Sequence, residues 1–371
     1  MSEKLIIRNF GPIKDMSFDF KKINILIGEQ GTGKSTVAKV ITAINSMADG
    51  DPGNLGAIKI LTSGEYGTRN HFVAHLKVYL IEGYLQNDTH IHYENDKFYF
   101  EYEVNRASIK AKNAEAVLYE AGVNEVTFIP ADRAAVNLFS NEVLLSFNEL
   151  EADLPSYFIR FARLYNRFKK LKPEFDFSDL IGVKFKYKND RDIIVLHDGE
   201  EINIKEASSA LQTNISLLII LSYFEKFTDR LENMNTESNL VIIEEPELNC
   251  FPALQKKTIQ YIINCLYIRN GDFFSRTLIT THSPYILTSL NNLMYAYQAG
   301  LNYESEINKI VDKKYWVNPF DVSAYLMLPN GECESILDRE GLIKTEKIDG
   351  ISGILNKEFN EMFDIELAIK K

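Results

Sequence analysis

The chain has few cysteines, and their spacing indicates neither a metal site nor a disulfide framework. Among 371 residues there are only three, Cys250, Cys265 and Cys333, and no two form a Cys-x-x-Cys pair. Tryptophan is rarer still, with a single residue. Cysteine usage of this kind is typical of a reducing compartment, so we expect a cytoplasmic protein.

Long apolar runs and an export signal are also missing. The most apolar stretch, around residues 217–221, is far too short to cross a bilayer. Residues 1–4 lead directly into a predicted strand and contain no signal-peptide core. Internal repeats and low-complexity tracts are absent from the sequence. We therefore expect no membrane contact, and one large domain or two smaller ones.

An excess of positive charge is lacking too. The net charge is −11, so the chain does not have the overall electrostatic footprint of a nucleic-acid-binding protein. One local basic cluster contains Arg160, Arg163, Arg167, Lys169, Lys170 and Lys172. It is interpreted either as a solvated helix face or as a contact for nucleic acid or a partner. Nucleic acid is thus an open but unfavoured partner.

The sequence does contain a complete phosphate-binding loop, Gly28-Glu29-Gln30-Gly31-Thr32-Gly33-Lys34-Ser35. A continuous apolar run at 23–27 predicts a buried strand before it, and helical spacing of apolar residues follows it. Such loops bind phosphates through inward-pointing N–H groups and the positive end of the next helix. The predicted nucleotide contacts are Gly28, Gly31, Gly33, Lys34, Ser35 and Thr36, with Lys34 on the β- and γ-phosphates and Ser35 also on Mg²⁺.

A second apolar strand, predicted at 240–243, ends in two carboxylates, Glu244 and Glu245. Adjacent carboxylates repel each other, and a nearby cation together with a reactive water explains their presence. In P-loop hydrolases the first such residue holds Mg²⁺ and its neighbour orients or deprotonates the attacking water. The two motifs together predict a Mg²⁺-dependent ATP phosphohydrolase, with ATP and Mg²⁺ as cofactors.

The segment Glu244-Glu245-Pro246-Glu247-Leu248-Asn249, with Pro252 following, closely resembles the EEPE-type Walker B and D-loop of ABC-class ATPases. The resemblance is greatest to the SMC-like and OLD-nuclease-like groups. The opening Ile7-Arg8-Asn9-Phe10-Gly11-Pro12-Ile13 looks like their N-terminal hairpin, and Thr281-His282-Ser283-Pro284 is similar to their switch histidine. The resemblance covers about residues 1–290 and implies that Glu245, His282 and Glu244 are the candidate catalytic residues.

This resemblance implies an α/β fold: an ABC-type ATPase head with a parallel sheet core, an antiparallel β lobe and a helical insertion. The expected division is an N-terminal lobe at 1–140, the insertion at 141–180, a C-terminal lobe at 181–290 and a tail of unassigned role at 291–371. The tail lacks the length and acidic pattern of the Toprim nuclease domain of OLD-type proteins, so we expect no nuclease activity within the chain.

Two further family motifs have imperfect counterparts. Ala207-Ser208-Ser209-Ala210-Leu211-Gln212 occupies the place of the signature, with Ala210 where glycine is usual. In the family, the signature serines of one subunit cap the γ-phosphate held by another, and the alanine implies looser closure or slower hydrolysis. A plain helix cap is the alternative for Ser208 and Ser209. At the Q-loop position there is no glutamine. Either Asp132 or Arg133 is expected to be the polar contact with the nucleotide. The alternative is that these two residues form a salt-bridged loop corner.

The predicted function is an ATP-hydrolysing switch that works as a head-to-tail dimer or higher oligomer. Stand-alone ATPases of this kind resemble the ATPase subunits of bacterial anti-phage defence systems, Septu-like or PARIS-like, which implies a separate effector such as a nuclease or toxin. The alternative is a DNA-repair or chromosome-handling SMC-like ATPase. A third interpretation, motivated by Ala210, is a nucleotide-binding scaffold with little hydrolysis.

Periodicity predicts the remaining elements by their positions. We expect a loop at 49–69 with a short element at 58–61, helices at 72–85, 141–171, 208–227, 253–268 and 348–369, and strands at 5–7, 18–20, 97–104, 126–129, 183–187, 193–196, 277–281 and around 324–327.

Overall fold

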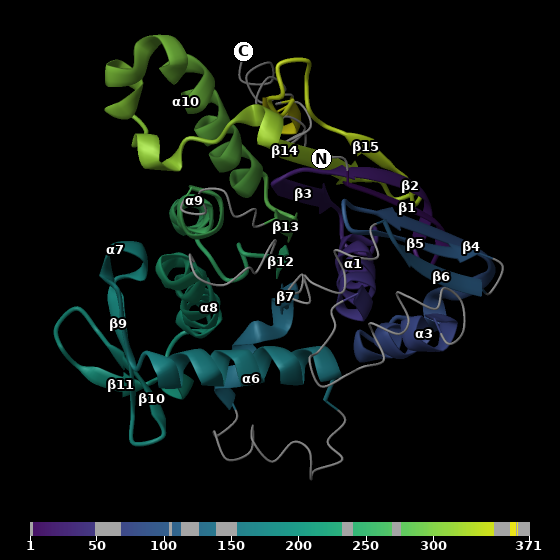
Figure 1. The fold of residues 1–371 in the computed structure, drawn as a ribbon. Coiled ribbons are helices and arrows are strands. Elements are labelled where there is room, and N and C mark those ends of the chain that lie inside the picture. Colours follow the sequence, from purple (N-terminus) through teal and green to yellow (C-terminus); the bar gives the residue numbers. More distant parts are fainter. Residues whose placement is uncertain are drawn as a thin grey trace.

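A six-stranded, mainly parallel sheet runs through the centre of the protein (Figure 1). The computed structural model describes residues 3–48, 68–103, 106–112, 126–138, 154–231, 240–268, 276–344, 357–360 and 362. In spatial order the strands are β15 (Cys333–Ser335), β14 (Val322–Met327), β3 (Ile23–Gly28), β13 (Arg276–Thr281), β12 (Leu240–Glu244) and β7 (Val126–Ile129). All neighbours pair in parallel except β14 and β15.

Both faces of the three central strands β3, β13 and β12 are buried, and β3 and β12 consist largely of branched apolar residues. Alternate residues enter two different hydrophobic cores, as the two-residue period of a strand requires. In β12, Val241 and Ile243 pack with one core, whereas Leu240 and Ile242 pack with the other. The central sheet therefore separates the two hydrophobic cores and contributes side chains to both.

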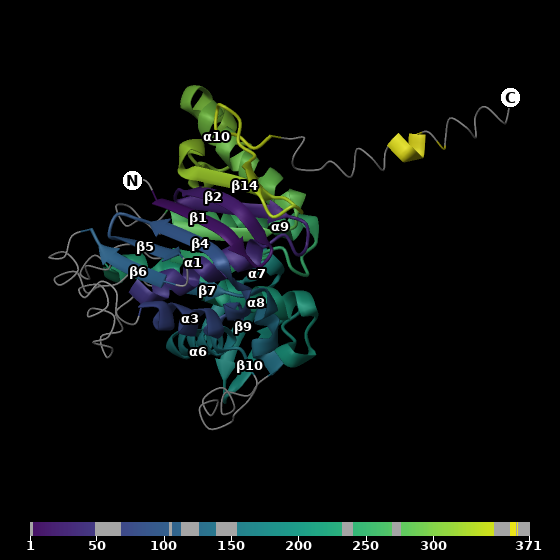
Figure 2. The same ribbon diagram turned by 90° about the vertical axis from the view of Figure 1, so that its right-hand side faces the viewer.

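One half consists of helix α1 (Lys34–Ala48) and an antiparallel sheet that covers it. Figures 1 and 2 show α1 between the two sheets, with α3 (Thr68–Val78) beside it. The antiparallel strands are, in spatial order, β2 (Ile13–Phe20), β1 (Glu3–Phe10), β4 (Leu85–Glu94), β5 (Phe98–Glu103) and β6 (Arg106–Ala111), and η1 (Glu82–Tyr84) precedes β4.

The other half is mainly helical and packs on the opposite face of the central sheet (Figure 1). Its long helices are α6 (Ser156–Leu171), α8 (Ser209–Leu231), α9 (Pro252–Ile263) and α10 (Pro284–Asn308). A small antiparallel sheet has the order β11 (Glu201–Asn203), β10 (Arg191–Val195), β9 (Val183–Lys188) and β8 (Glu174–Phe177). Short turns complete the chain: η2 (Ala131–Leu138), α7 (Ser178–Ile181), η3 (Ile204–Glu206), η4 (Asn264–Ile268), η5 (Lys313–Tyr315) and η6 (Pro319–Asp321).

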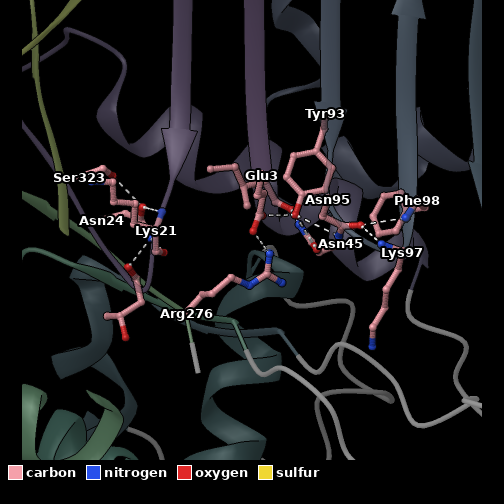
Figure 3. A network of polar contacts seen from close by, with 12 residues as sticks. Glu3, Lys21, Asn24, Asn45, Tyr93, Asn95, Lys97, Phe98, Arg276 and Ser323 are labelled. Atoms are coloured by element: carbon pink, nitrogen blue, oxygen red, sulfur yellow. Dashed lines mark hydrogen bonds and ion pairs between the residues drawn. The ribbon is translucent and has the colours of Figure 1, made fainter. Parts of the chain in front are cut away.

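Buried polar contacts join the two sheets at the end of the central sheet where β13 begins (Figure 3). The Glu3 carboxylate accepts from the Arg276 guanidinium and from the Tyr93 hydroxyl, and that hydroxyl also lies 3.2 Å from Asn45 Oδ1 on α1. Burial raises the pKa of Tyr93, so the phenol stays neutral. Nearby, Asn24 Nδ2 donates to Thr277 O at 3.0 Å, which fixes β3 against β13.

The fold class is the predicted one: an α/β protein with a parallel core, an antiparallel lobe and a helical segment. The predicted strands at 126–129 and 277–281 and the hairpin at 183–196 are confirmed. Helix α6 begins directly after Pro155, as expected for a proline at a helix start, while residues 141–153 of that prediction lie outside the described residues. The predicted insertion at 141–180 also contains β8, which pairs with β9.

Three predictions were wrong in detail. The helix expected at 72–85 ends at Val78, because Leu80 takes a left-handed φ of 57°, and β4 then starts at Leu85. The helix expected at 253–268 is α-helical only to Ile263, and Asn264–Ile268 form a π-helical turn directly after it. Of the loop expected at 49–69, residues 49–67 lie outside the described residues, and Thr68 and Arg69 belong to α3 instead. Most of the helix expected at 348–369 also lies outside the described residues.

The tail at 291–371 contains part of the core. Its strand β14 lies next to β3, with Met327 paired to Gly28 at the start of the phosphate loop. This position was not expected from the sequence. Among the residues that the structure describes, no helix combines the length and apolar character needed to cross a membrane.

Candidate nucleotide site

The predicted chemical groups meet at one edge of the central sheet, because its parallel strands all end there. Register pairs Ile27 with Thr281 and Thr280 with Glu244, so the phosphate loop, His282 and the two glutamates follow three adjacent strands. Ligands of open α/β sheets bind at this carboxyl edge. The structure thus brings together the groups that the sequence separates by more than two hundred positions.

The phosphate loop has little space for side chains at two of its glycines. A Cβ on Gly28 would lie 2.5 Å from Met327 O, so the neighbouring strand β14 requires glycine there. Gly33 has φ +99°, and a Cβ there would lie 3.0 Å from Ile13 Cγ1 of the N-terminal hairpin. Ser35 and Thr36 follow in the first turn of α1, where unpaired N–H groups favour an anion.

Lys34, His282 and Glu245 form a continuous line of contacts across the edge. Lys34 Nζ lies 3.4 Å from His282 Nδ1, and His282 Nε2 lies 3.4 Å from Glu245 Oε1. Lys34 Nζ also donates to the carbonyls of Gly28 and Glu29, each at 2.8 Å. The ammonium is therefore held over its own loop, where it can exchange these carbonyls for phosphate oxygens.

The surroundings of Lys34 disfavour its charge. Burial lowers the pKa of its ammonium to about 8, and the Glu245 and Glu247 carboxylates limit the shift. Phosphate oxygens stabilise the charged form, so binding ATP raises this pKa. Below pH 8 the lysine is already protonated, whereas above pH 8 binding must also take up a proton.

We expect ATP affinity to be constant between pH 6.5 and 7.5 and to fall by about tenfold by pH 9, since each pH unit above the pKa costs a factor of ten. Titration calorimetry at pH 8.5 in two buffers of different ionisation enthalpy measures the proton uptake directly. Equal affinity at pH 7 and pH 9 with no proton uptake would contradict the role assigned to Lys34.

Glu244 and Ser35 fit the predicted magnesium site. Glu244 Oε2 accepts from Ala131 N at 3.3 Å, whereas its buried Oε1 has no hydrogen-bond partner among the described residues. Burial raises the pKa of Glu244, and hydrogen bonding from Ser35 opposes the shift. A buried carboxylate oxygen without a donor, next to a serine hydroxyl, is a suitable set for a hard cation that prefers oxygen.

Arg133 does not lie where a nucleotide could touch it. It is fully buried, and its guanidinium donates to the carbonyls of Glu244 at 2.7 Å, Glu245 at 2.8 Å and Pro130 at 3.1 Å. The predicted nucleotide contact at Arg133 is therefore wrong, because its resolved bonds all go to backbone carbonyls, those of Pro130 and of the two glutamates. Asp132 is exposed at this corner and accepts from the Tyr157 hydroxyl at 3.1 Å.

The backbone at Glu245 needs such support. Its φ of 44° is left-handed, which costs free energy in a residue other than glycine. Besides the Arg133 bond, Glu245 N donates to Thr280 O at 2.9 Å. Leu248 N also donates to Glu245 O at 3.1 Å, and these three bonds hold the predicted base in a strained conformation beside His282.

Among the described residues, those of the predicted signature do not contact the phosphate loop of the same chain. Ser208 and Ser209 are exposed at the start of α8, and Ser208 Oγ accepts a long bond of 3.4 Å from Leu211 N. No hydrogen bond or ion pair in the described segments joins either serine to the phosphate loop. The turn that follows β12 contacts the first part of α8, where Asn249 Nδ2 donates to Thr213 Oγ1 at 3.1 Å.

The sequence predicted no separate role for Glu247, the last glutamate of the EEPE motif. Its Oε1 accepts from His282 N and Thr281 Oγ1, both at 2.7 Å. A glutamate repeated after a Walker B pair was the available signal. No sequence pattern indicated that Met327 lies beside Gly28, because β14 and β3 are about three hundred residues apart in the sequence and their pairing leaves no local pattern.

Comparisons with known proteins bear on this site. Solved structures resemble the chain at low sequence identity, and three of them are examples. An SMC head bound to the C-terminal winged-helix domain of ScpA is 11% identical, with a TM-score of 0.43 over 90% of this chain and 96% of the other. The SMC head domain from Thermotoga maritima is 10% identical, with a TM-score of 0.39 over 90% and 98%. The recombination mediator RecF bound to ATPγS is 11% identical, with a TM-score of 0.42 over 91% and 98%.

No curated protein matches the sequence. The model of a family described as an AAA ATPase domain does, over residues 1–115 and 103–287, which span the phosphate loop, both glutamates and His282. The expectation of a P-loop ATPase is confirmed by this match, and the chain belongs to the AAA ATPase domain family.

Proposed function

We propose that the protein is a Mg²⁺-dependent ATP-hydrolysing switch whose catalytic site is completed by a second copy of the chain. The line of contacts from Lys34 through His282 to Glu245 carries this proposal, because it joins a phosphate-binding cation to a carboxylate base. The exposed start of α8, apart from that line, is the surface that supplies Ser208 and Ser209 to the partner's site.

Each residue then has a defined task. The loop glycines and Lys34 bind the phosphates, Glu245 takes a proton from the attacking water, and His282 orients Glu245 and contacts the γ-phosphate. Ser35 and Glu244 hold Mg²⁺, which when bound neutralises charge that develops on the β- and γ-phosphates. The serine hydroxyls and the N–H groups at the α8 start cap the nucleotide from the partner copy.

Nucleotide-dependent association tests this proposal. We expect the protein with a non-hydrolysable ATP analogue and Mg²⁺ to double its mass in light scattering after gel filtration, because the phosphates bridge the two copies. EDTA in place of Mg²⁺ and the variant Ser209→Arg should both leave the monomer mass. A mass that does not respond to nucleotide under any condition would contradict the composite site.

We propose further that the switch controls a separate effector, a nuclease or toxin, in anti-phage defence. The support is the resemblance of the Glu244–Asn249 segment to SMC-like and OLD-like ATPases, whose stand-alone members resemble the ATPase subunits of such systems. Co-purification with the products of neighbouring genes, with ATP and with ADP, is the test. A complex whose stability depends on the bound nucleotide is the expected result, and no retention in either state would contradict it.

The second candidate is a DNA-handling ATPase, and one feature of α6 favours it. Arg160, Arg163, Arg167 and Lys170 recur at helical spacing and are all exposed, so they form one basic face. Lys169 is not part of it, since its ammonium is buried and pairs with Asp192 at 2.7 Å. Salt-sensitive binding of duplex DNA that Arg163→Glu with Arg167→Glu abolishes would favour this function. Unchanged anisotropy of labelled DNA would remove it.

A further inference from the structure

The hydrogen bonds around His282 single out Glu247, in the turn that follows β12. One oxygen, Oε1, accepts from His282 N and from Thr281 Oγ1, both at 2.7 Å. Thr281 is the last residue of β13, and His282 follows it directly. Because two short bonds converge on one carboxylate oxygen, the backbone of His282 has a fixed position relative to this turn.

A second connection reaches the same segment but not the histidine itself. Gln255 on α9 donates to Cys250 O at 3.0 Å and accepts from Ser283 Oγ at 2.5 Å. It holds the start of α10, where Ser283 also caps Tyr285 N. Among the resolved side-chain bonds of this segment, only the one from Glu247 engages the N–H of His282.

The other end of the turn contacts α8. Asn249 Nδ2 donates to Thr213 Oγ1 at 3.1 Å, and Cys250 Sγ lies 3.3 Å from Asn214 Oδ1. Thr213 and Asn214 lie one turn beyond Ser209 on the same helix. The turn at residues 246–250 therefore connects the α8 start to the carboxylate that holds His282.

We propose that Glu247 is a positioning residue for ATP hydrolysis: it holds His282 against Glu245 and Lys34, and it links that histidine to the α8 start that caps the partner's nucleotide. The inference rests on the proposed function, because it requires hydrolysis with Glu245 as the base. Glu247 itself touches no substrate. Its bonds act on the backbone, so it changes where the imidazole lies rather than its chemistry.

Two substitutions separate this role from a purely electrostatic one. Glu247→Asp keeps the negative charge but is one methylene too short to hold His282 N. Glu247→Gln keeps the length and an acceptor oxygen but loses the charge. Its amide nitrogen replaces Oε2, which has no hydrogen-bond partner among the described residues, so no existing bond is lost.

The experiment measures kcat, ATP affinity and melting temperature for both variants, with Glu174→Asp on the exposed edge of β8 as the matched control. We expect Glu247→Asp to lower kcat by roughly 10–100-fold, the cost of a misplaced catalytic group, with ATP affinity within about threefold. Glu247→Gln should keep kcat within about threefold of wild type, since the bond to His282 N persists.

Three results would overturn the assignment: wild-type kcat in Glu247→Asp, equal loss in both variants, or a parallel fall of kcat and affinity. Glu245→Gln, measured alongside, distinguishes the two levels of inference. If its kcat stays within about threefold of wild type, the proposed function fails. If its kcat falls by roughly 10²–10³-fold while Glu247→Asp has wild-type kcat, only the role of Glu247 fails.

Discussion

Glu245→Gln is expected to lower kcat for ATP hydrolysis by roughly 10²–10³-fold and to leave ATP affinity within a factor of about three. The amide is nearly isosteric, so the contact with His282 Nε2, now 3.4 Å from Oε1, can be kept. It cannot accept a proton from water, so the chemical step slows while phosphate binding through Lys34 continues. Phosphate release and equilibrium binding of a fluorescent ATP analogue measure the two effects separately.

The control is Glu174→Gln, an exposed glutamate on β8 that should leave both quantities unchanged. Turnover of Glu245→Gln within threefold of wild type would show that another group activates the water. A loss of affinity as large as the loss of kcat would instead place Glu245 in ground-state binding.

Arg133→Met is expected to destabilise the fold by about 3–5 kcal/mol and to abolish turnover. The guanidinium satisfies three carbonyls, those of Pro130, Glu244 and Glu245, in a fully buried position. Methionine fills most of the volume but donates no hydrogen bond, so buried acceptors lose their partners. Glu245, with its left-handed φ, loses one of the three hydrogen bonds of its backbone and keeps those with Thr280 O and Leu248 N.

Urea unfolding and thermal melting measure the loss, and Arg167→Met on the exposed face of α6 is the matched control. That control should lie within about 0.5 kcal/mol of wild type, as for most surface substitutions. Equal stability of the two methionine variants would mean that the bonds of Arg133 contribute nothing net to the fold.

The parts of this site that the sequence predicted are those with local determinants. A buried strand, glycines at fixed spacing and an amphipathic helix follow one another around Lys34, and the whole unit formed as expected. The same holds for β12 and Glu244, since four branched apolar residues before a carboxylate are typical of a buried strand end. Parallel pairing then determines that Glu244 and His282 share an edge.

Contacts across the fold were not predictable in this way. Arg133 looked like a polar contact for nucleotide because nothing in its own segment shows that the carbonyls of Glu244 and Glu245, more than one hundred positions away, accept from its guanidinium. Strand β14 belongs to a tail without a motif, yet Met327 borders the loop at Gly28. At Leu80 the helical spacing continued past a residue that turns left-handed, so apolar periodicity alone extended α3 too far.

Mixing two inactive variants tests most directly whether one protomer binds ATP and its neighbour caps it. Lys34→Ala removes phosphate binding, and Ser209→Arg blocks the cap, so each alone should be inactive. Neither variant can pair with itself around a nucleotide, so only unlike protomers associate. Each such pair has one intact site of two, so up to about half of wild-type turnover should return in an equal mixture. A mixture that stays as inactive as its components would contradict the composite site.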